Sequence, residues 1–155
     1  MIQTRNITEE ITPRTGLSFT VPHKARILIV SSKGSDAERL RTSFEEAGLT
    51  SESVNSITEG CEAAKSGRFQ VVFSPPIMAD GSWRRLIDVA HHYGLSFEVI
   101  LLARSFDLNQ WAEALQVGAF DVLDVLRDLP KAAETAKLAL GTGDLKQFRP
   151  RPAQA

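Results

Sequence analysis

Apolar residues in this chain form short continuous runs that alternate with stripes of helical spacing. Continuous apolar runs of about four to eight residues are typical of strands buried on both faces of a parallel sheet. We expect five strands, at 25–30, 50–55, 69–74, 97–103 and 120–124. The second run is the most polar of the five, which suits a strand at the edge of a sheet.

The stripes between these runs repeat every three to four residues, which places apolar side chains on one face of a helix. We expect helices over 35–47, 58–66, 83–93 and 107–117, and a last one from Asp128 or Leu129 to about 140. Thr58 is the expected N-cap of the second helix. In the fourth helix, the residues that recur at helical spacing, and so share one face, are Leu108, Trp111, Ala112 and Leu115.

Five strands that alternate with five helices predict an α/β fold, a three-layer α/β/α sandwich around a five-stranded parallel sheet. Right-handed crossovers leave few topologies, and we expect the flavodoxin-like order 2-1-3-4-5. A site would then lie at the carboxyl ends of the first and third strands. Ser31, Ser32 and Pro75 fall at that edge, with Ala103 beside them.

The chain divides into a central domain and two polar ends. We expect a flexible leader at 1–24, a domain at 25–140 and a flexible tail at 141–155. The single Cys61 cannot form an internal disulfide, and the net charge of −1 gives no electrostatic case for nucleic acid or an anionic membrane. No apolar run is long enough for a membrane span, and no secretory signal is visible, so we expect a cytoplasmic protein.

Three segments resemble the receiver domain of two-component response regulators. ARILIV (25–30) is similar to the family's first strand, and MADGSW (78–83) to its loop after strand three. ALQVGAFDVLD (114–124) is similar to the end of the fourth helix and the fifth strand. The resemblance spans roughly 25–140 and implies the receiver fold.

The same resemblance places the family's switch residues on positions that lack their chemistry. The family's acidic Mg²⁺ pair falls on Ser31 and Ser32, and its phosphoacceptor aspartate falls on Pro75, or on Ser74 if the alignment slips by one. The hydroxyl residue that ends strand four falls on Ala103. The lysine after strand five falls on Val125, and the aromatic switch residue of strand five falls on Val122. Mg²⁺ prefers carboxylate oxygens, and phosphoryl transfer needs a nucleophile, a metal and a cationic group. We therefore expect a degenerate pseudo-receiver with no metal, no cofactor and no enzymatic activity.

The favoured hypothesis is a phosphorylation-independent protein-interaction module in bacterial signal transduction. Its partner would be a signalling kinase, an output protein or a second copy. The resemblance implies contact through the face of helix four, strand five and helix five, with candidate residues Gln110, Trp111, Ala114, Val122, Asp124, Arg127 and Lys131. Tryptophan is enriched at interface hot spots, although Trp111 could equally cap the core.

Two alternatives remain open, and a third is disfavoured. The turn Ser31–Ser35, which includes Lys33, could sense a small ligand or an anion, although it lacks the spacing of a P-loop and is more simply a turn capped by Ser35. The second alternative is a phosphorelay receiver that is modified at a non-standard residue. An enzyme of flavodoxin-like architecture lacks a visible base, nucleophile or metal ligand. Helix-end and turn positions account for Asp36, Asp80 and the pair His91–His92.

Overall fold

A computed structural model describes residues 26–148, with side chains up to 141. The expected leader and residues 149–155 lie outside this range. The main elements are β1 (Ile27–Val30), α1 (Gly34–Glu46), β2 (Ser51–Val54), α2 (Ile57–Ala64), β3 (Val71–Ser74), α3 (Arg84–Tyr93), β6 (Glu98–Ala103), α4 (Leu108–Val117), β7 (Ala119–Asp124), the 3₁₀ turn η1 (Leu129–Lys131) and α5 (Ala132–Phe148).

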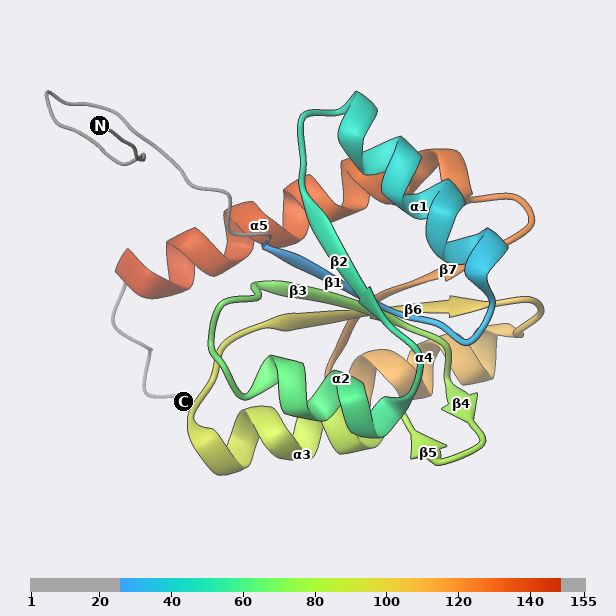
Figure 1. The fold of residues 1–155 in the computed structure, drawn as a ribbon. Coiled ribbons are helices and arrows are strands. Elements are labelled where there is room, and N and C mark those ends of the chain that lie inside the picture. Colours follow the sequence, from blue (N-terminus) through green and yellow to red (C-terminus); the bar gives the residue numbers. More distant parts are fainter. Residues whose placement is uncertain (1–25, 149–155) are drawn as a thin grey trace, which may run out of the picture.

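The five long strands form one parallel sheet in the order β2-β1-β3-β6-β7. This is the predicted order 2-1-3-4-5 once the short extra strands are left out of the numbering, so the predicted fold class is confirmed. β2 is the edge strand expected from its polar sequence, because its middle residues, Glu52 and Ser53, are exposed. Figure 1 shows the twisted sheet between two layers of helices.

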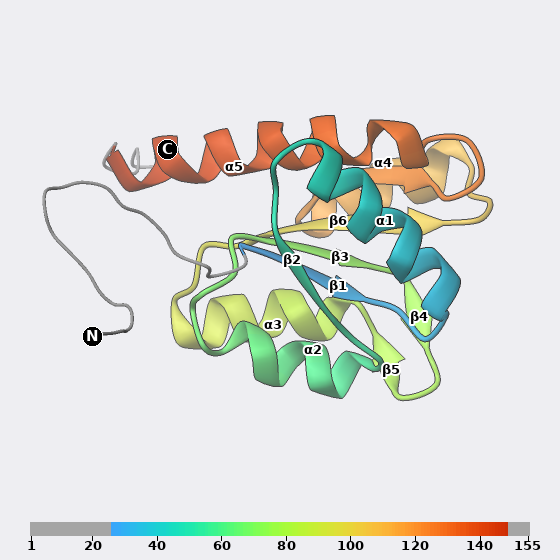
Figure 2. The same ribbon diagram turned by 45° about the horizontal axis from the view of Figure 1, so that its top comes forward.

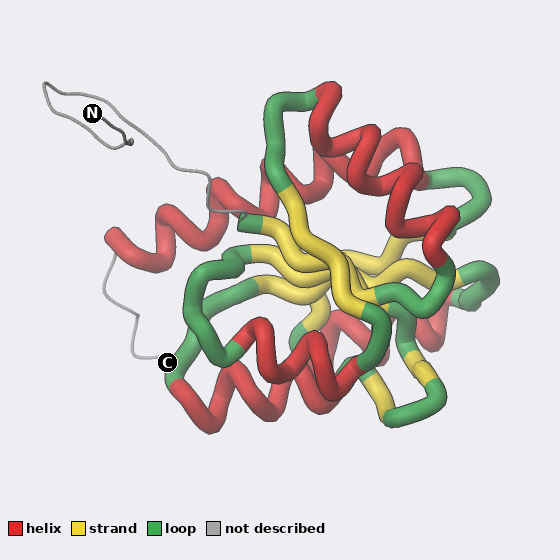
Figure 3. The backbone as a smooth tube through the Cα atoms, in the orientation of Figure 1, coloured by secondary structure: helices red, strands yellow, loops and turns green. Residues whose placement is uncertain are grey.

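Helices α1 and α5 cover one face of the sheet, and α2, α3 and α4 cover the other (Figures 1, 2 and 3). Alternate side chains of β1 divide between these layers. Leu28 and Val30 pack with α2 and α3, whereas Ile27 and Ile29 pack with α1 and α5. All four are fully buried, which explains why the sequence of this central strand is continuously apolar.

A small hairpin between β3 and α3 was not predicted. It consists of β4 (Ile77–Met78) and β5 (Gly81–Ser82), joined by the two-residue turn Ala79–Asp80. Gly81 has φ 149°, and a Cβ there would lie 2.9 Å from Cδ of Arg85. The segment that resembles the receiver loop after strand three is therefore this hairpin.

The apolar residues that share one face of helix α4 lie mostly outside the core. Leu108 is 79% exposed and Trp111 37% exposed, whereas Ala114 is buried. Asp107 and Gln110 form a capping box that fixes the start of the helix. The small side chain of Ala114 lets the helix approach β7, so the larger apolar residues lie on its outer side.

Helix α5 continues past 140, where the sequence predicted its end, to Phe148. Figure 2 shows its last turns extending beyond the sheet. Gly141, where the tail was expected to begin, lies within this helix. Among residues 26–148, no helix is both long and apolar enough to cross a membrane.

Candidate functional site

A cavity of about 420 Å³ lies at the carboxyl ends of the central strands. The N-terminal end of α1, the β4–β5 hairpin and the connection from β6 to α4 all lie at this edge (Figure 1). The lining residues are Val30, Ser31, Ser32, Lys33, Asp36, Pro75, Pro76, Ile77, Met78, Leu102, Ala103, Arg104, Ser105 and Val125. The fold therefore brings together four separate segments of the sequence.

Five of the six residues predicted for this site line the same cavity, namely Ser31, Ser32, Pro75, Ala103 and Val125. Ser74 is not among the lining residues. It ends β3, is fully buried, and donates its hydroxyl to the carbonyl oxygen of Pro75 at 2.8 Å. The strand end that the receiver resemblance associates with phosphorylation therefore has a buried serine followed by a proline.

Three charged side chains line the cavity, those of Lys33, Asp36 and Arg104. The sequence analysis proposed only Lys33 as a site residue, in the sensor alternative. Asp36 lies in the first turn of α1, as predicted, but it also lines the cavity. One of its oxygens is 3.3 Å from a guanidinium nitrogen of Arg104, which directly follows β6. No local pattern links residues 68 positions apart in sequence; only the parallel pairing of β1, β3 and β6 brings their ends together.

The turn between β1 and α1 is held by Ser31. Its hydroxyl oxygen accepts a hydrogen bond from the backbone N–H of Lys33 and donates to the carbonyl of the same residue, both at 3.1 Å. Lys33 is the N-cap residue of α1 and makes no side-chain cap hydrogen bond. The prediction that Ser35 caps this helix is wrong, because α1 already begins at Gly34.

The lining of the cavity does not fit Mg²⁺. Among its residues only Asp36 is a carboxylate, and that carboxylate pairs with Arg104. Within the described part of the chain, no cluster of three or more histidine, cysteine, aspartate or glutamate residues could hold a metal ion. A hard divalent cation needs several oxygen ligands, preferably anionic ones.

Asp80 does not line the cavity, but binds the N-terminal end of α2. Its two carboxylate oxygens accept the backbone N–H groups of Ile57 (3.0 Å) and Thr58 (2.7 Å). The hydroxyl of Ser56 accepts the N–H of Glu59 at 3.0 Å, so Ser56 is the N-cap of α2 and the prediction of Thr58 was wrong. The pKa of Asp80 is lowered from 3.8 to about 2. The hydrogen bond from the Thr58 side chain is the largest cause, and the one from the Thr58 backbone is the next.

The predicted partner face is only partly exposed. Gln110, Trp111, Arg127 and Lys131 are exposed, but Ala114, Val122 and Asp124 are buried. This corrects the prediction for these three residues. Ala114 and Val122 lie between α4 and the sheet, where they line a hollow of about 190 Å³.

Asp124 organises the turn after β7. Its Oδ1 accepts the backbone N–H of Leu126 at 2.8 Å, and its own N–H donates to Oδ2 of Asp128 at 3.0 Å. The hydrogen bond from Leu126 holds the pKa of Asp124 below its usual value, and the nearby Arg127 contributes in the same direction. The carboxylate is therefore occupied by its own turn and is not available to a partner.

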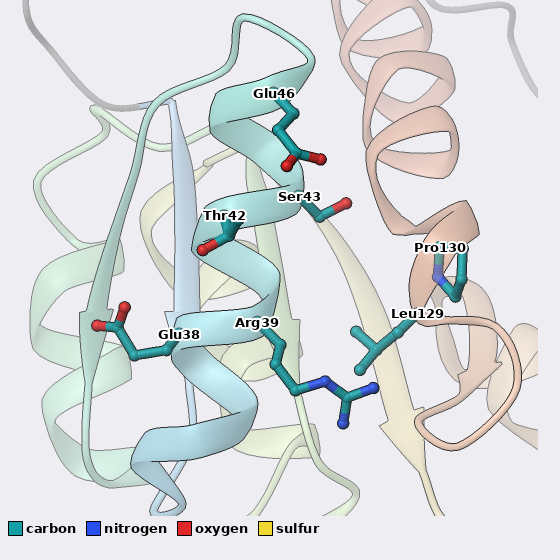
Figure 4. A pocket seen from close by; sticks show the side chains of 7 residues that line it. All are labelled: Glu38, Arg39, Thr42, Ser43, Glu46, Leu129 and Pro130. Carbon is teal, nitrogen blue, oxygen red and sulfur yellow. The ribbon is translucent and has the colours of Figure 1, made fainter.

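A second cavity, of about 460 Å³, lies between α1 and η1. Figure 4 shows Arg39 reaching from α1 toward Leu129 and Pro130, whereas Glu38 points to the other side of the helix. The groove is lined mainly by polar and charged residues of α1. It contains no group that the sequence analysis proposed for chemistry.

Neither the protein-family models nor the curated proteins include a match to this chain. Among solved structures, it is similar to the signal receiver domain of a putative Luxo repressor protein from Vibrio parahaemolyticus, with a TM-score of 0.74 and 16% identity, covering 81% of this chain and 97% of that chain. The chain has the fold of a response-regulator receiver domain.

Two further solved structures have the same receiver fold. The signal receiver domain of an HD domain-containing protein from Pseudomonas fluorescens Pf-5 has a TM-score of 0.71 and 22% identity, covering 85% of this chain and 98% of that chain. The receiver domain of the histidine kinase CKI1 from Arabidopsis thaliana has a TM-score of 0.63 and 17% identity, covering 76% and 90%. That domain was solved in complex with Mg²⁺ and BeF₃⁻.

Proposed function

We propose that this receiver-fold protein acts in signal transduction as a non-catalytic module whose protein contacts do not depend on phosphorylation. The observation that carries the proposal is the lining of the cavity at the carboxyl edge. It offers hydroxyls, prolines, apolar side chains and the cation Lys33, and its one carboxylate, Asp36, is paired with Arg104. Phosphoryl transfer to an aspartate needs a free carboxylate with a metal beside it, and this lining offers neither a free carboxylate nor a set of oxygen ligands that suits Mg²⁺.

Beryllofluoride with Mg²⁺ tests this proposal directly, because BeF₃⁻ imitates a phosphoryl group on an aspartate. We expect the amide NMR spectrum of the whole chain to stay unchanged at 31–36, 103–105 and Val125 when both are added. The CKI1 receiver domain, which was solved in complex with Mg²⁺ and BeF₃⁻, is treated in the same buffer and verifies that the reagent is active. Localised shifts at these residues would overturn the proposal and favour a receiver modified at a non-standard residue.

The outer side of α4 is the surface that we propose for protein contact. Its apolar residues Leu108, Trp111, Ala112 and Leu115, here called the α4 stripe, recur at helical spacing, and Leu108 and Trp111 are the large exposed members. Asn109 and Gln116, which directly follow Leu108 and Leu115 in the sequence, are exposed and uncharged. Exposed apolar residues clustered on one helix face are typical of docking sites, and the stripe favours a partner with an apolar, weakly charged surface.

Two measurements distinguish the possible occupants of the α4 stripe. Sedimentation velocity over a range of concentrations reports self-association, and photo-crosslinking from position 112 in cells reports another protein. Trp111→Ala should abolish whichever complex forms, whereas Tyr93→Ala, which removes an exposed aromatic residue at the end of α3, should leave it intact. If the chain stays monomeric and crosslinks to no protein in a way that depends on Trp111, the α4 stripe is not a contact surface.

A further inference from the structure

We propose that the cavity at the carboxyl edge binds a small organic monocarboxylate with an apolar body, whose carboxylate competes with Asp36 for Arg104. This deepens the proposed function, because it gives a phosphorylation-independent module a chemical input at the edge of the sheet. The inference rests on the cavity's size, the distribution of apolar and polar groups around it, and its balance of charges.

The size and composition of the cavity match those of a small-molecule site. Its volume of about 420 Å³ falls within the range of roughly 300–1,000 Å³ typical of ligand pockets. Proline, alanine, valine, leucine and methionine side chains form much of its wall, including Pro75, Ala103 and Val125. Such a wall is suited to an apolar body and offers little to a fully hydrated inorganic ion.

The polar groups of the cavity belong to two segments. Ser31, Ser32 and Lys33 come from the turn after β1, and Arg104 and Ser105 come from the segment after β6. The Ser31 hydroxyl already donates within its own turn, but the other four can donate hydrogen bonds to a ligand through a hydroxyl, an ammonium or a guanidinium group. A carboxylate between the two segments could accept from both, and a guanidinium can bind it in a two-pronged geometry.

The charges around the cavity select a monoanion. Lys33 and Arg104 carry two positive charges, and Asp36 carries one negative charge, which leaves an excess of one positive charge. The ion pair between Asp36 and Arg104 is long, at 3.3 Å, and the Arg104 side chain is 49% exposed. The Asp36 side chain is only 17% exposed, so the pair is partly screened by solvent and of modest strength, and a ligand carboxylate that makes its own hydrogen bonds to Arg104 competes with it.

Binding at Arg104 would act on the segment that leads into α4. Arg104 directly follows β6, and α4 begins at Leu108 with the capping box of Asp107 and Gln110. A ligand that moves the Arg104 guanidinium away from Asp36 therefore changes the connection immediately before the α4 stripe. We expect amide signals at 104–108 to shift together with those at 31–36.

The test is an NMR titration of the whole chain, with a chelator present so that Mg²⁺ is absent. The probes are isovalerate, benzoate and 2-naphthoate, each compared with its neutral amide. We expect at least one acid to cause saturable shifts at 31–36 and 103–105, with an affinity about tenfold or more above that of its amide because a charged hydrogen bond is lost. If no acid shifts these residues, or an amide binds as well as its acid, the proposal fails.

Three variants identify the side chains involved. Arg104→Met should weaken binding by about tenfold or more, and Arg39→Met, which removes the same charge from the outer side of α1, should have no effect. Asp36→Asn should strengthen binding, because it frees Arg104 and removes a repelling charge. Unchanged binding in Arg104→Met, or weaker binding in Asp36→Asn, would overturn the proposal. Failure here leaves the Mg²⁺ and beryllofluoride result untouched, so the two proposals are tested separately.

Discussion

At the scale of single residues, two aspartates that occupy similar local positions in the sequence have different contacts in the structure. Asp36 and Asp80 both sit where local rules favour an aspartate, the first turn of a helix and a tight turn. In the structure Asp36 lines the cavity, whereas Asp80 binds the N-terminus of a helix more than 20 residues away in sequence. Their different tasks follow from the partners that the fold brings to them.

Asp80→Asn tests the long-range cap of α2. The neutral amide is a weaker acceptor for the N–H groups of Ile57 and Thr58, so we expect a lower urea midpoint at neutral pH. The pKa of Asp80 is depressed to about 2, so the carboxylate stabilises the fold above pH 3.8 and loses this effect as the pH falls toward 2.

Urea unfolding at several pH values provides the measurement. The difference between the wild type and Asp80→Asn should be largest at neutral pH and shrink between about pH 4 and pH 2. Asp88→Asn, which removes an exposed carboxylate from α3, is the control and should behave like the wild type. A difference that stays constant over this pH range would exclude the carboxylate as its source.

The sequence identified five of the eleven uncharged residues that line the cavity, but of its three charged residues it proposed only Lys33. Strand ends can be located from apolar runs, and parallel strands end at a common edge, so Ser31, Pro75 and Ala103 could be placed together. The pair formed by Asp36 and Arg104 depends on side-chain directions across two loops. No periodic pattern encodes these directions, so they became visible only with the fold.

At the scale of elements, α2 lies unusually close to β1 because of Gly60. A Cβ at this position would be 2.8 Å from Cγ2 of Val30, which is fully buried. A glycine inside a helix normally costs about 1 kcal/mol relative to alanine, so its presence here reflects packing. The sequence showed the helix but not this contact, because glycine gives no signal in a hydrophobic pattern.

Gly60→Ala should therefore destabilise the protein although alanine favours helices. Overpacking costs about 1–3 kcal/mol, and the gain in helix propensity offsets about 1 kcal/mol of it, which leaves a loss of about 1 kcal/mol. Gly141→Ala is the matched control, because no atom lies within 4 Å of a Cβ there, and it should stabilise the protein slightly. If urea unfolding shows both variants stabilised, the close approach of α2 to β1 is not supported.

The two tryptophans test the register of α4. Trp83 precedes α3 and is 5% exposed, whereas Trp111 on α4, for which the sequence left core and surface equally open, is 37% exposed. We expect Trp83→Ala to cost about 3–5 kcal/mol and Trp111→Ala about 1 kcal/mol or less. Urea unfolding of both variants measures these free energies. Equal costs would indicate that Trp111 packs in the core, as Trp83 does.

At the scale of the whole molecule, the fold was more predictable than the surface. Strand order follows from alternation and handedness, which act along the entire chain. Which apolar residues of α4 lie outside depends on how closely one small residue, Ala114, lets the helix approach the sheet. The sequence pattern therefore predicted the strand order, but it left open whether Trp111 faces the core or the surface.

The long α5 offers a test of where the stable domain ends. Its buried residues, among those whose side chains are described, are Ala132, Thr135, Ala136, Ala139 and Leu140. Beyond these, the helix continues to Phe148 and extends past the sheet (Figure 2). Deletion of residues 142–155 should therefore leave the free energy of unfolding unchanged within about 0.5 kcal/mol, because stability comes from the buried face.

A longer deletion provides the contrast for this prediction. Removal of residues 139–155 also takes away Ala139 and Leu140, which pack in the layer of α1 and α5. It should cost about 2 kcal/mol or more because buried apolar groups are lost. Urea unfolding of the three chains would contradict the assignment if the shorter deletion already caused most of this loss. In that case the projecting turns of α5 would contribute to the core, and the stable domain would extend beyond 141.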